Sequence, residues 1–181
     1  MAEVARRQAP QFAATSWLRP LPPATRLIFH GGQKARTIAA AAWGVGFADA
    51  ACRAQSSRSR ATLWMGPDEY LLIDDDAAAA PAFEVLTQAL ASVAHALVDI
   101  SHRQIAFEIK GQHAEAILAG GCPLDLDMES FPLGMCTRTI CGKADIVLWR
   151  TAGDTFHVEV WRSFSDYFVA LLTEIAQDNV A

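Results

Sequence analysis

The chain has 181 residues, with 15 basic and 20 acidic side chains, a formal net charge of −5 and a hydrophobic fraction of 52%. This acidic balance argues against a nucleic-acid partner, which would require a basic face to meet phosphates. The high apolar content and the charged fraction of only 19% exclude extensive disorder. No apolar run reaches the roughly 18–20 residues that a membrane-spanning helix needs, so no membrane association is expected.

The first residues lack the pattern of a secretory signal, because no apolar stretch follows Arg6 and Arg7. We therefore expect a cytoplasmic protein whose cysteines remain thiols. These cysteines are interpreted as small core residues: Cys52, Cys122, Cys136 and Cys141.

Residues 1–24 differ from the rest of the chain because four prolines interrupt regular structure there. We predict an extended, proline-rich N-terminal arm over this segment. The arm carries large apolar side chains, among them Phe12 and Trp17. Either these side chains fold back onto the body or they lie on another chain, and the sequence leaves both alternatives open. Residues 25–181 are predicted to form a single α+β domain.

The first half of this domain is predicted to contain a strand at 26–30, a helix at 33–43, a hairpin of strands at 62–65 and 70–73, a second helix at 83–93 and a last strand at 96–100. The hairpin turn is Gly66-Pro67-Asp68-Glu69, in which Pro67 presets the backbone φ. Residues 53–60 are interpreted as a polar loop, and residues 74–80 as a solvated connector.

The second half is predicted to contain a strand at 105–109, a short helix at 114–118, three strands at 138–141, 145–150 and 156–161, and a final helix at 164–175. Phe164, Phe168 and Leu172 fall on one face of the final helix and are expected in the core. Ser163 and Asp166 have the spacing of a capping box at its start.

The predicted order is β-α-β-β-α-β followed by β-α-β-β-β-α. Each half has the pattern of a ferredoxin-like split βαβ unit, although no internal sequence repeat establishes the pairing. The expected fold class is therefore α+β, built from two such halves with mostly antiparallel sheet.

No catalytic constellation is visible in the sequence. No two histidines lie four residues apart, and no CxxC, GxGxxG, GxxxxGK[ST] or GxSxG motif occurs. Ser101 and His102 are neighbours, so in a strand their side chains would point to opposite faces. Asp99 and Ser101 are interpreted as local hydrogen-bonding groups at a strand end, and Asp125-Leu126-Asp127 as turn residues.

Six blocks in a fixed order carry a family resemblance. They are LWMGPDEYLL at 63–72, VDISHRQ at 98–104, CPLDLD with FPLG between 122 and 134, TRT at 137–139, DTF at 154–156 and RSF at 162–164. Together, across about residues 25–176, they resemble the gamma subunit family of heterotetrameric sarcosine oxidase. That resemblance implies a fold similar to the folate-binding domain of the glycine-cleavage aminomethyltransferase.

The resemblance also implies a function. The family's complex is a cytoplasmic oxidoreductase with alpha, beta, gamma and delta chains. It oxidatively demethylates sarcosine to glycine and yields hydrogen peroxide with formaldehyde or methylenetetrahydrofolate. This chain would be a non-catalytic subunit that stabilises the assembly, with no catalytic residue, cofactor or metal of its own. FAD, FMN, NAD, tetrahydrofolate and zinc are expected elsewhere in the complex.

Candidate subunit-interface residues follow from the preference of permanent interfaces for aromatic and arginine anchors. They are Phe12, Trp17, Arg103, Arg138, Trp161 and Arg162. Trp161 is expected on the outer face of its strand. For each arginine, the alternative is an ordinary surface position or a salt bridge within the chain.

A second functional hypothesis is a stand-alone folate-dependent one-carbon transferase or a folate-binding module. Asp99-Ile100-Ser101-His102 also resembles the DVSHM stretch of aminomethyltransferases. Against this alternative, a signature of the KGCYxGQE type is absent, and the chain is about half the length of that enzyme.

Overall fold

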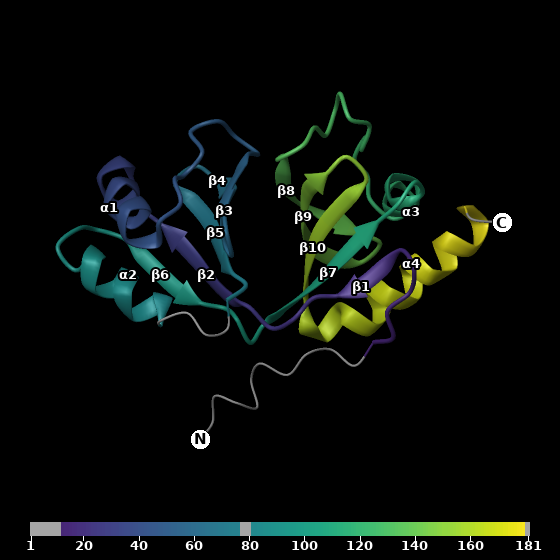
Figure 1. The fold of residues 1–181 in the computed structure, drawn as a ribbon, viewed down its shortest axis with the longest axis horizontal. Coiled ribbons are helices and arrows are strands. Elements are labelled where there is room, and N and C mark those ends of the chain that lie inside the picture. Colours follow the sequence, from purple (N-terminus) through teal and green to yellow (C-terminus); the bar gives the residue numbers. More distant parts are fainter. Residues whose placement is uncertain (1–11, 77–80, 180–181) are drawn as a thin grey trace, which may run out of the picture. The chain divides into compact units, whose positions relative to one another are not determined.

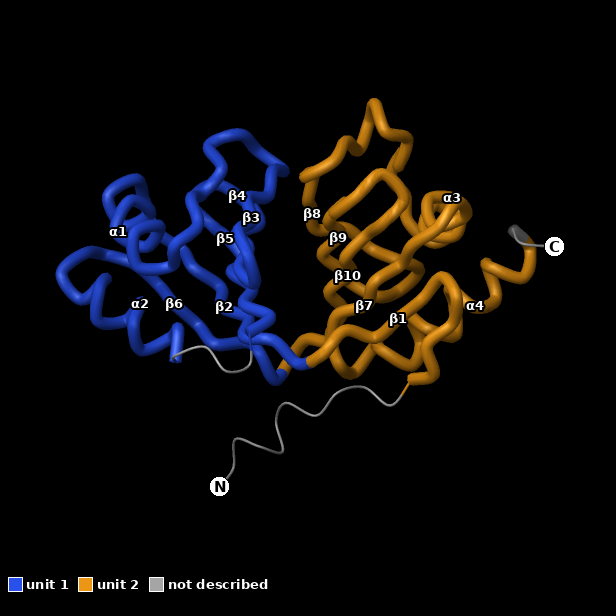
Figure 2. Tube along the Cα trace, viewed as in Figure 1, with its two compact units in different colours: residues 1–8, 23–102 blue, residues 9–22, 103–181 orange. Residues whose placement is uncertain are grey.

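The computed structural model describes residues 12–76 and 81–179, so residues 1–11 of the predicted arm and residues 77–80 of the predicted connector lie outside the described residues. The chain divides into two compact units (Figure 2). Of the described residues, unit 1 comprises 23–76 and 81–102, and unit 2 comprises 12–22 and 103–179. The unit boundary after His102 falls inside the VDISHRQ block.

Unit 1 contains five strands and two helices in its described residues (Figure 1). In chain order they are β2 Thr25–His30, α1 Gln33–Trp43, β3 Ala54–Ser57, β4 Arg60–Gly66, β5 Glu69–Asp74, α2 Ala82–Leu90 and β6 Ala96–Asp99. The strands form one sheet in the order β3-β4-β5-β2-β6, and every neighbouring pair is antiparallel. Residue side chains from both helices and from β2 and β5 share one core cluster, so the helices cover one face of the sheet.

The connection from β2 to α1 depends on a close approach of the chain to itself. A Cβ at Gly31 would lie 2.8 Å from both the Ala35 Cβ and the Phe29 ring, so only glycine fits there. The helix ends where Gly44 adopts φ +79, which is a left-handed conformation that favours glycine. Both boundaries of the predicted Ala-rich helix are therefore fixed by its flanking glycines.

Unit 2 contains five strands, two α-helices and a 3₁₀ turn in its described residues (Figure 1). They are β1 Leu18–Pro20, β7 Gln104–Lys110, α3 Ala114–Ala119, β8 Cys136–Cys141, β9 Ala144–Ala152, β10 Thr155–Trp161, η2 Arg162–Phe164 and α4 Ser165–Asn179. The sheet order is β1-β7-β10-β9-β8, again with antiparallel neighbours. Its core cluster joins side chains of α3 and α4 to those of β7, β9 and β10.

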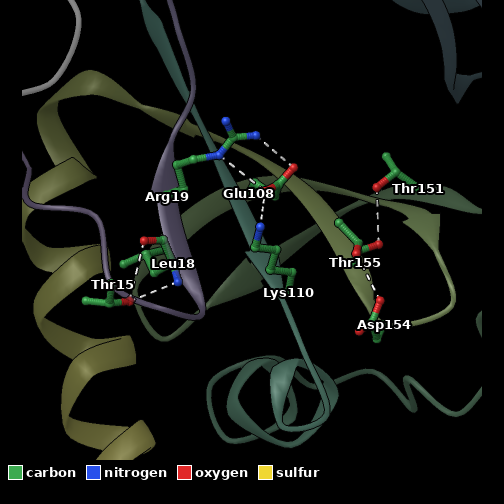
Figure 3. A network of polar contacts seen from close by, with 8 residues as sticks. All are labelled: Thr15, Leu18, Arg19, Glu108, Lys110, Thr151, Asp154 and Thr155. Carbon is green, nitrogen blue, oxygen red and sulfur yellow. Dashed lines mark hydrogen bonds and ion pairs between the residues drawn. The ribbon is translucent and has the colours of Figure 1, made fainter.

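Strand β1 brings the proline-rich segment into the sheet of unit 2. Leu18 pairs with Ile109, and Arg19 pairs with Glu108. Figure 3 shows the side chains above this pairing, where Arg19 donates to both carboxylate oxygens of Glu108 at 3.2 and 3.1 Å and Lys110 approaches the same carboxylate at 3.6 Å. The expectation that prolines exclude regular structure here is wrong for Leu18–Pro20. An edge strand tolerates proline, since only one side of it needs donors.

The predicted fold class is confirmed: both units are ferredoxin-like split βαβ assemblies of α+β type with antiparallel sheet. Strand β3 is a correction, because it occupies part of the predicted polar loop and pairs with β4. Gln55, Ser56 and Ser57 are polar and exposed, so the segment lacks the hydrophobic pattern from which a strand is predicted. No helix in the described parts of the chain is long and apolar enough to cross a membrane.

Candidate interface surface

An exposed aromatic–arginine cluster lies where β10 passes into α4. We define it as Arg103, Trp161, Arg162, Phe164 and Tyr167. The three rings keep substantial exposure for their size, at 40% for Trp161, 36% for Phe164 and 37% for Tyr167. Exposed large aromatic side chains gathered next to arginines are typical of protein interfaces.

The geometry of this cluster is set by the pairing of β7 with β10. Trp161 is opposite Gln104 in the register, which places Arg103 beside the end of β10. The Arg103 Cζ lies 5.0 Å from the centroid of the Trp161 ring. The backbone N–H of Arg162 donates to the Arg103 carbonyl at 2.8 Å. The pairing thus brings Arg103 next to Trp161 and Arg162, two further predicted interface residues that lie almost sixty positions later in the sequence.

Phe164 and Tyr167 complete the cluster, and sequence analysis did not place them there. Their rings meet edge to face with centroids 6.5 Å apart. Phe164 was expected in the core, but it belongs to the 3₁₀ turn η2, whose tighter winding takes it off the stripe that buries Phe168 and Leu172. The predicted capping box is also wrong, because Ser163 lies inside η2, which has no side-chain cap, and the Ser165 hydroxyl instead donates to the Arg162 carbonyl at 2.8 Å.

Tyr167 is fixed by the turn between β8 and β9. Its hydroxyl accepts a hydrogen bond from the Lys143 backbone N–H at 3.1 Å. A Cβ at Gly142, which has φ +57, would lie 2.4 Å from the same hydroxyl oxygen. The ring is therefore held in place against a glycine turn, while 37% of the residue's surface remains exposed.

Phe12 and Trp17 pack within unit 2. Both are partly buried against its core cluster, and the Phe12 ring lies 5.6 Å from the Phe107 ring. The Trp17 carbonyl accepts a hydrogen bond from the Lys110 backbone N–H at 2.9 Å. Of the two alternatives for these side chains, the structure therefore shows them folded back onto the body of the chain.

Arg138 is exposed on β8, and the structure does not bring it into the aromatic–arginine cluster. It pairs with Val147 on β9, whereas β10, which carries Trp161, is the next strand across the sheet. Its position at the edge strand thus defines a separate part of the unit 2 surface.

The Asp99–Ser101 stretch contains local hydrogen bonds, as predicted. The Ser101 backbone N–H donates to Asp99 Oδ1 at 2.8 Å, and the Ser101 hydroxyl oxygen accepts from the Arg26 backbone N–H at 2.9 Å. Ser101 is 5% exposed. These contacts close the end of β6 against β2, so the resemblance to the DVSHM stretch corresponds here to a structural turn.

The loop between α3 and β8 contains the predicted turn at Asp125–Asp127. The Asp127 backbone N–H and the Ser130 hydroxyl donate to the two Asp125 carboxylate oxygens at 3.1 and 2.8 Å. These two hydrogen bonds, with the backbone N–H the stronger influence, lower the pKa of the Asp125 carboxyl. The buried Arg150 guanidinium holds this loop by donating to the carbonyls of Leu126 and Gly153 and to Glu115.

Ionisable side chains inside unit 2 are occupied by structural contacts. His157 Nε2 lies 2.8 Å from Glu159 Oε1, and both residues are buried. The Cys122 sulfur is 3.7 Å from the Thr139 hydroxyl, and burial raises the pKa of the Cys122 thiol. Within residues 12–76 and 81–179, no group of three or more His, Cys, Asp or Glu residues is arranged to hold a metal ion.

The fold has a clear similarity to a domain of known structure. The chain superposes on the glycine cleavage system aminomethyltransferase T of Bartonella henselae with a TM-score of 0.64 and 12% sequence identity, covering 86% of this chain and 44% of that one. At this identity the similarity defines the class of fold: a paired α+β unit of the aminomethyltransferase type.

The sequence comparisons identify the family within that class. Residues 32–178 match the family described as sarcosine oxidase, gamma subunit. The chain is 30% identical over 132 residues to sarcosine oxidase subunit gamma of Corynebacterium sp. strain P-1, covering 71% of this chain. It is 28% identical over 144 residues to the subunit of strain U-96, covering 79% of this chain and 69% of that subunit. This chain belongs to the sarcosine oxidase gamma subunit family.

A solved complex contains a chain of closely similar structure. A chain of heterotetrameric sarcosine oxidase from Corynebacterium sp. U-96, solved with pyrrole 2-carboxylate, superposes with a TM-score of 0.84 and 27% identity. The superposition covers 91% of this chain and 85% of that chain. The match to the strain P-1 subunit spans 64% of that subunit's length.

Proposed function

We propose that this chain is the non-catalytic gamma subunit of a heterotetrameric sarcosine oxidase. The observation that carries the proposal is the superposition of 91% of the chain, at a TM-score of 0.84, on a chain of such a complex. The aromatic–arginine cluster supports it, since Trp161, Phe164 and Tyr167 expose rings that a partner would cover. The chain stabilises the assembly through this surface.

In this proposal the partners are alpha, beta and delta subunits in the cytoplasm. The complex oxidatively demethylates sarcosine to glycine and releases hydrogen peroxide with formaldehyde or methylenetetrahydrofolate. FAD, FMN, NAD, tetrahydrofolate and zinc belong to the other chains, and this chain contributes no catalytic group. Trp161, Arg103 and Arg162 are the central interface residues. Arg138 on the edge strand, with the partly exposed Phe12 and Trp17, contributes at most to the margin.

The proposal is tested by purifying the tagged full-length chain from its own cells. We expect a yellow complex of four different chains that consumes oxygen when sarcosine is added. The native mass, the visible absorption spectrum and oxygen uptake are measured on the same eluate. A colourless species with the 19.6 kDa mass of the single chain would contradict the proposal. Tight binding of tetrahydrofolate by that isolated species would favour the folate-binding alternative.

A further inference from the structure

Arg103 differs from the other stacked arginines of the chain in how its guanidinium group is used. In the described parts of the chain, four arginines lie over aromatic rings, with Cζ-to-centroid distances between 4.4 and 5.9 Å: Arg36 over Tyr70, Arg60 over Trp43, Arg103 over Trp161 and Arg150 over Phe156. Stacking on a ring fixes the plane of a guanidinium and leaves its N–H edge available for hydrogen bonds.

Three of the four donate hydrogen bonds from that N–H edge to oxygen acceptors within their own unit. Arg36 donates to the Tyr70 hydroxyl at 2.7 Å, and Arg60 donates to Asp74 at 2.7 Å and to the Trp43 carbonyl at 2.8 Å. Arg150 donates to two carbonyls and to Glu115. Arg60 and Arg150 join an aromatic ring to an oxygen acceptor of another residue, whereas Arg36 lies over the Tyr70 ring and donates to the hydroxyl of the same tyrosine.

The Arg103 guanidinium stacks on an aromatic ring, but among the described residues of the chain it donates no hydrogen bond to an oxygen acceptor. Its contact there is the stack on Trp161, and its backbone is anchored by the Arg162 N–H at 2.8 Å. The side chain is exposed, and its five N–H donors form a rigid fork that matches the two oxygens of a carboxylate. What Arg103 lacks, compared with Arg60, is the equivalent of Asp74.

The surroundings of Arg103 indicate the size of the missing partner. The Trp161 ring on which the guanidinium stacks is itself 40% exposed, which leaves apolar surface beside Arg103 that a small carboxylate ion has no group to cover. Tryptophan, tyrosine and arginine are the residues most enriched at the energetic centres of protein interfaces. A protein surface that presents a carboxylate beside apolar side chains satisfies both the guanidinium and the Trp161 ring.

We propose that Arg103, held in plane by Trp161, binds an aspartate or glutamate side chain of a partner subunit through two parallel N–H···O bonds. The same partner covers the exposed Trp161 ring. This inference rests on the proposed function and specifies the chemistry of the partner's surface. Inside unit 1, Arg60 likewise stacks on the Trp43 ring and donates to a carboxylate, through a single Nε–H···O bond to Asp74.

The test measures assembly with the full-length chain. Tagged wild-type and variant chains are titrated into partner subunits prepared from cells that lack this chain, and the dissociation constant is measured at two salt concentrations. Arg103→Ala is expected to weaken assembly by about 30-fold or more, because interface anchors typically contribute at that level. Arg103→Lys keeps the charge but loses the fork, and we expect it to recover only a minor part of the loss.

Lys34→Ala is the matched control, since it removes one exposed positive charge from α1 in unit 1. It should leave the dissociation constant unchanged, and thermal unfolding should confirm that all variants fold. An Arg103→Lys chain that assembles as tightly as wild type, or an Arg103→Ala chain that loses no affinity, would overturn the inference. Failure of the wild-type chain to bind any partner subunit would instead contradict the proposed function itself.

A chemical cross-link identifies the carboxylate. At concentrations that saturate assembly, a carbodiimide couples the amine of the Arg103→Lys variant to a carboxylate in direct contact with it. We expect a cross-link from position 103 to an aspartate or glutamate of a partner subunit. Cross-links from position 103 only to acidic residues of this same chain would contradict the proposed pair.

Discussion

The two units order their strands in the same way, but the strand at one edge of the sheet comes from a different part of the chain in each unit. In unit 1 the order is β3-β4-β5-β2-β6, and β6 follows directly after helix α2. In unit 2 the order is β8-β9-β10-β7-β1, and β1 comes from the N-terminal segment. Strand β1 therefore takes the position beside β7 that β6 takes beside β2.

The difference teaches that a proline-rich terminal segment can be an integral part of a sheet. β1 has only three residues, yet Leu18 is 2% exposed and Trp17 and Phe12 pack beside it. β6 is longer by one residue, but Val98 is 52% exposed. The short strand is thus the more deeply packed of the two. Four predictions test this contrast between the units.

Removing residues 1–21 should have the largest effect. The deletion uncovers the β7 edge and removes the packed side chains of Phe12, Trp17 and Leu18, which together stabilise by more than about 5 kcal/mol, comparable to the whole stability of a small domain. Hydrogen exchange followed by mass spectrometry should show lost protection in β7 and β10 and retained protection in β2 and β5. Removing only residues 1–11 is the control. Unchanged exchange in β7 after the longer deletion would show that β1 is dispensable.

Leu18→Ala should destabilise more than Val98→Ala. The first substitution leaves a cavity in the unit 2 core and should cost about 2–4 kcal/mol in the free energy of unfolding. The second affects an exposed side chain and should cost less than about 0.5 kcal/mol. Urea unfolding followed by circular dichroism gives both values. Equal costs would mean that the two edge strands contribute alike.

Arg150→Met should cost more than Arg60→Met, although both arginines stack on a ring. The Arg150 side chain is 1% exposed, and its loss leaves the carbonyls of Leu126 and Gly153 without this donor, at about 2–4 kcal/mol in all. The Arg60 side chain is 28% exposed, and Asp74 retains the Ser59 hydroxyl at 2.9 Å, so about 1–2 kcal/mol is expected. Thermal unfolding of the two variants measures the order, and the reverse order would contradict it.

Alkaline pH should affect the unit 2 core through Cys141. Burial, with a smaller influence from the neighbouring Cys122 thiol, raises the pKa of the Cys141 thiol to about 12. In the unfolded chain a cysteine thiol ionises at about pH 8.5. The contribution of the protonated Cys141 thiol to the free energy of unfolding is therefore complete below that pH and is lost as the pH rises toward 12. The free energy of unfolding should fall by up to about 1.4 kcal/mol per pH unit in that window.

Cys141→Ala is the control for the pH dependence and should flatten it. At pH 8 an alkylating reagent should modify Cys52, which is partly exposed, far faster than the buried Cys122, Cys136 and Cys141. Comparable labelling of Cys141 in the native protein would mean that the unit 2 core opens readily. Of the four predictions, the one for Cys141 has the smallest expected effect on stability at neutral pH.

Local signals in the sequence were sufficient for the elements that they flank. Glycines at 31, 32 and 44 delimit α1, the Gly66-Pro67 turn joins β4 to β5, and the alternation of Ile105, Phe107 and Ile109 marks β7. The Asp125 and Asp99 turns were also predicted, since a short acidic side chain bonds a backbone N–H two residues ahead. Each of these signals acts within a few residues of the backbone that it shapes.

The sequence by itself determined the fold class, the order of most elements and, through its ordered motif blocks, the family. Only the tertiary structure decided that Leu18–Pro20 is a strand, that Phe164 leaves the core and that Arg103 stacks on Trp161. The physical reason is the distance along the chain. The β1–β7 and Arg103–Trp161 contacts join residues more than fifty positions apart, and the local pattern of a strand does not indicate which distant segment pairs with it.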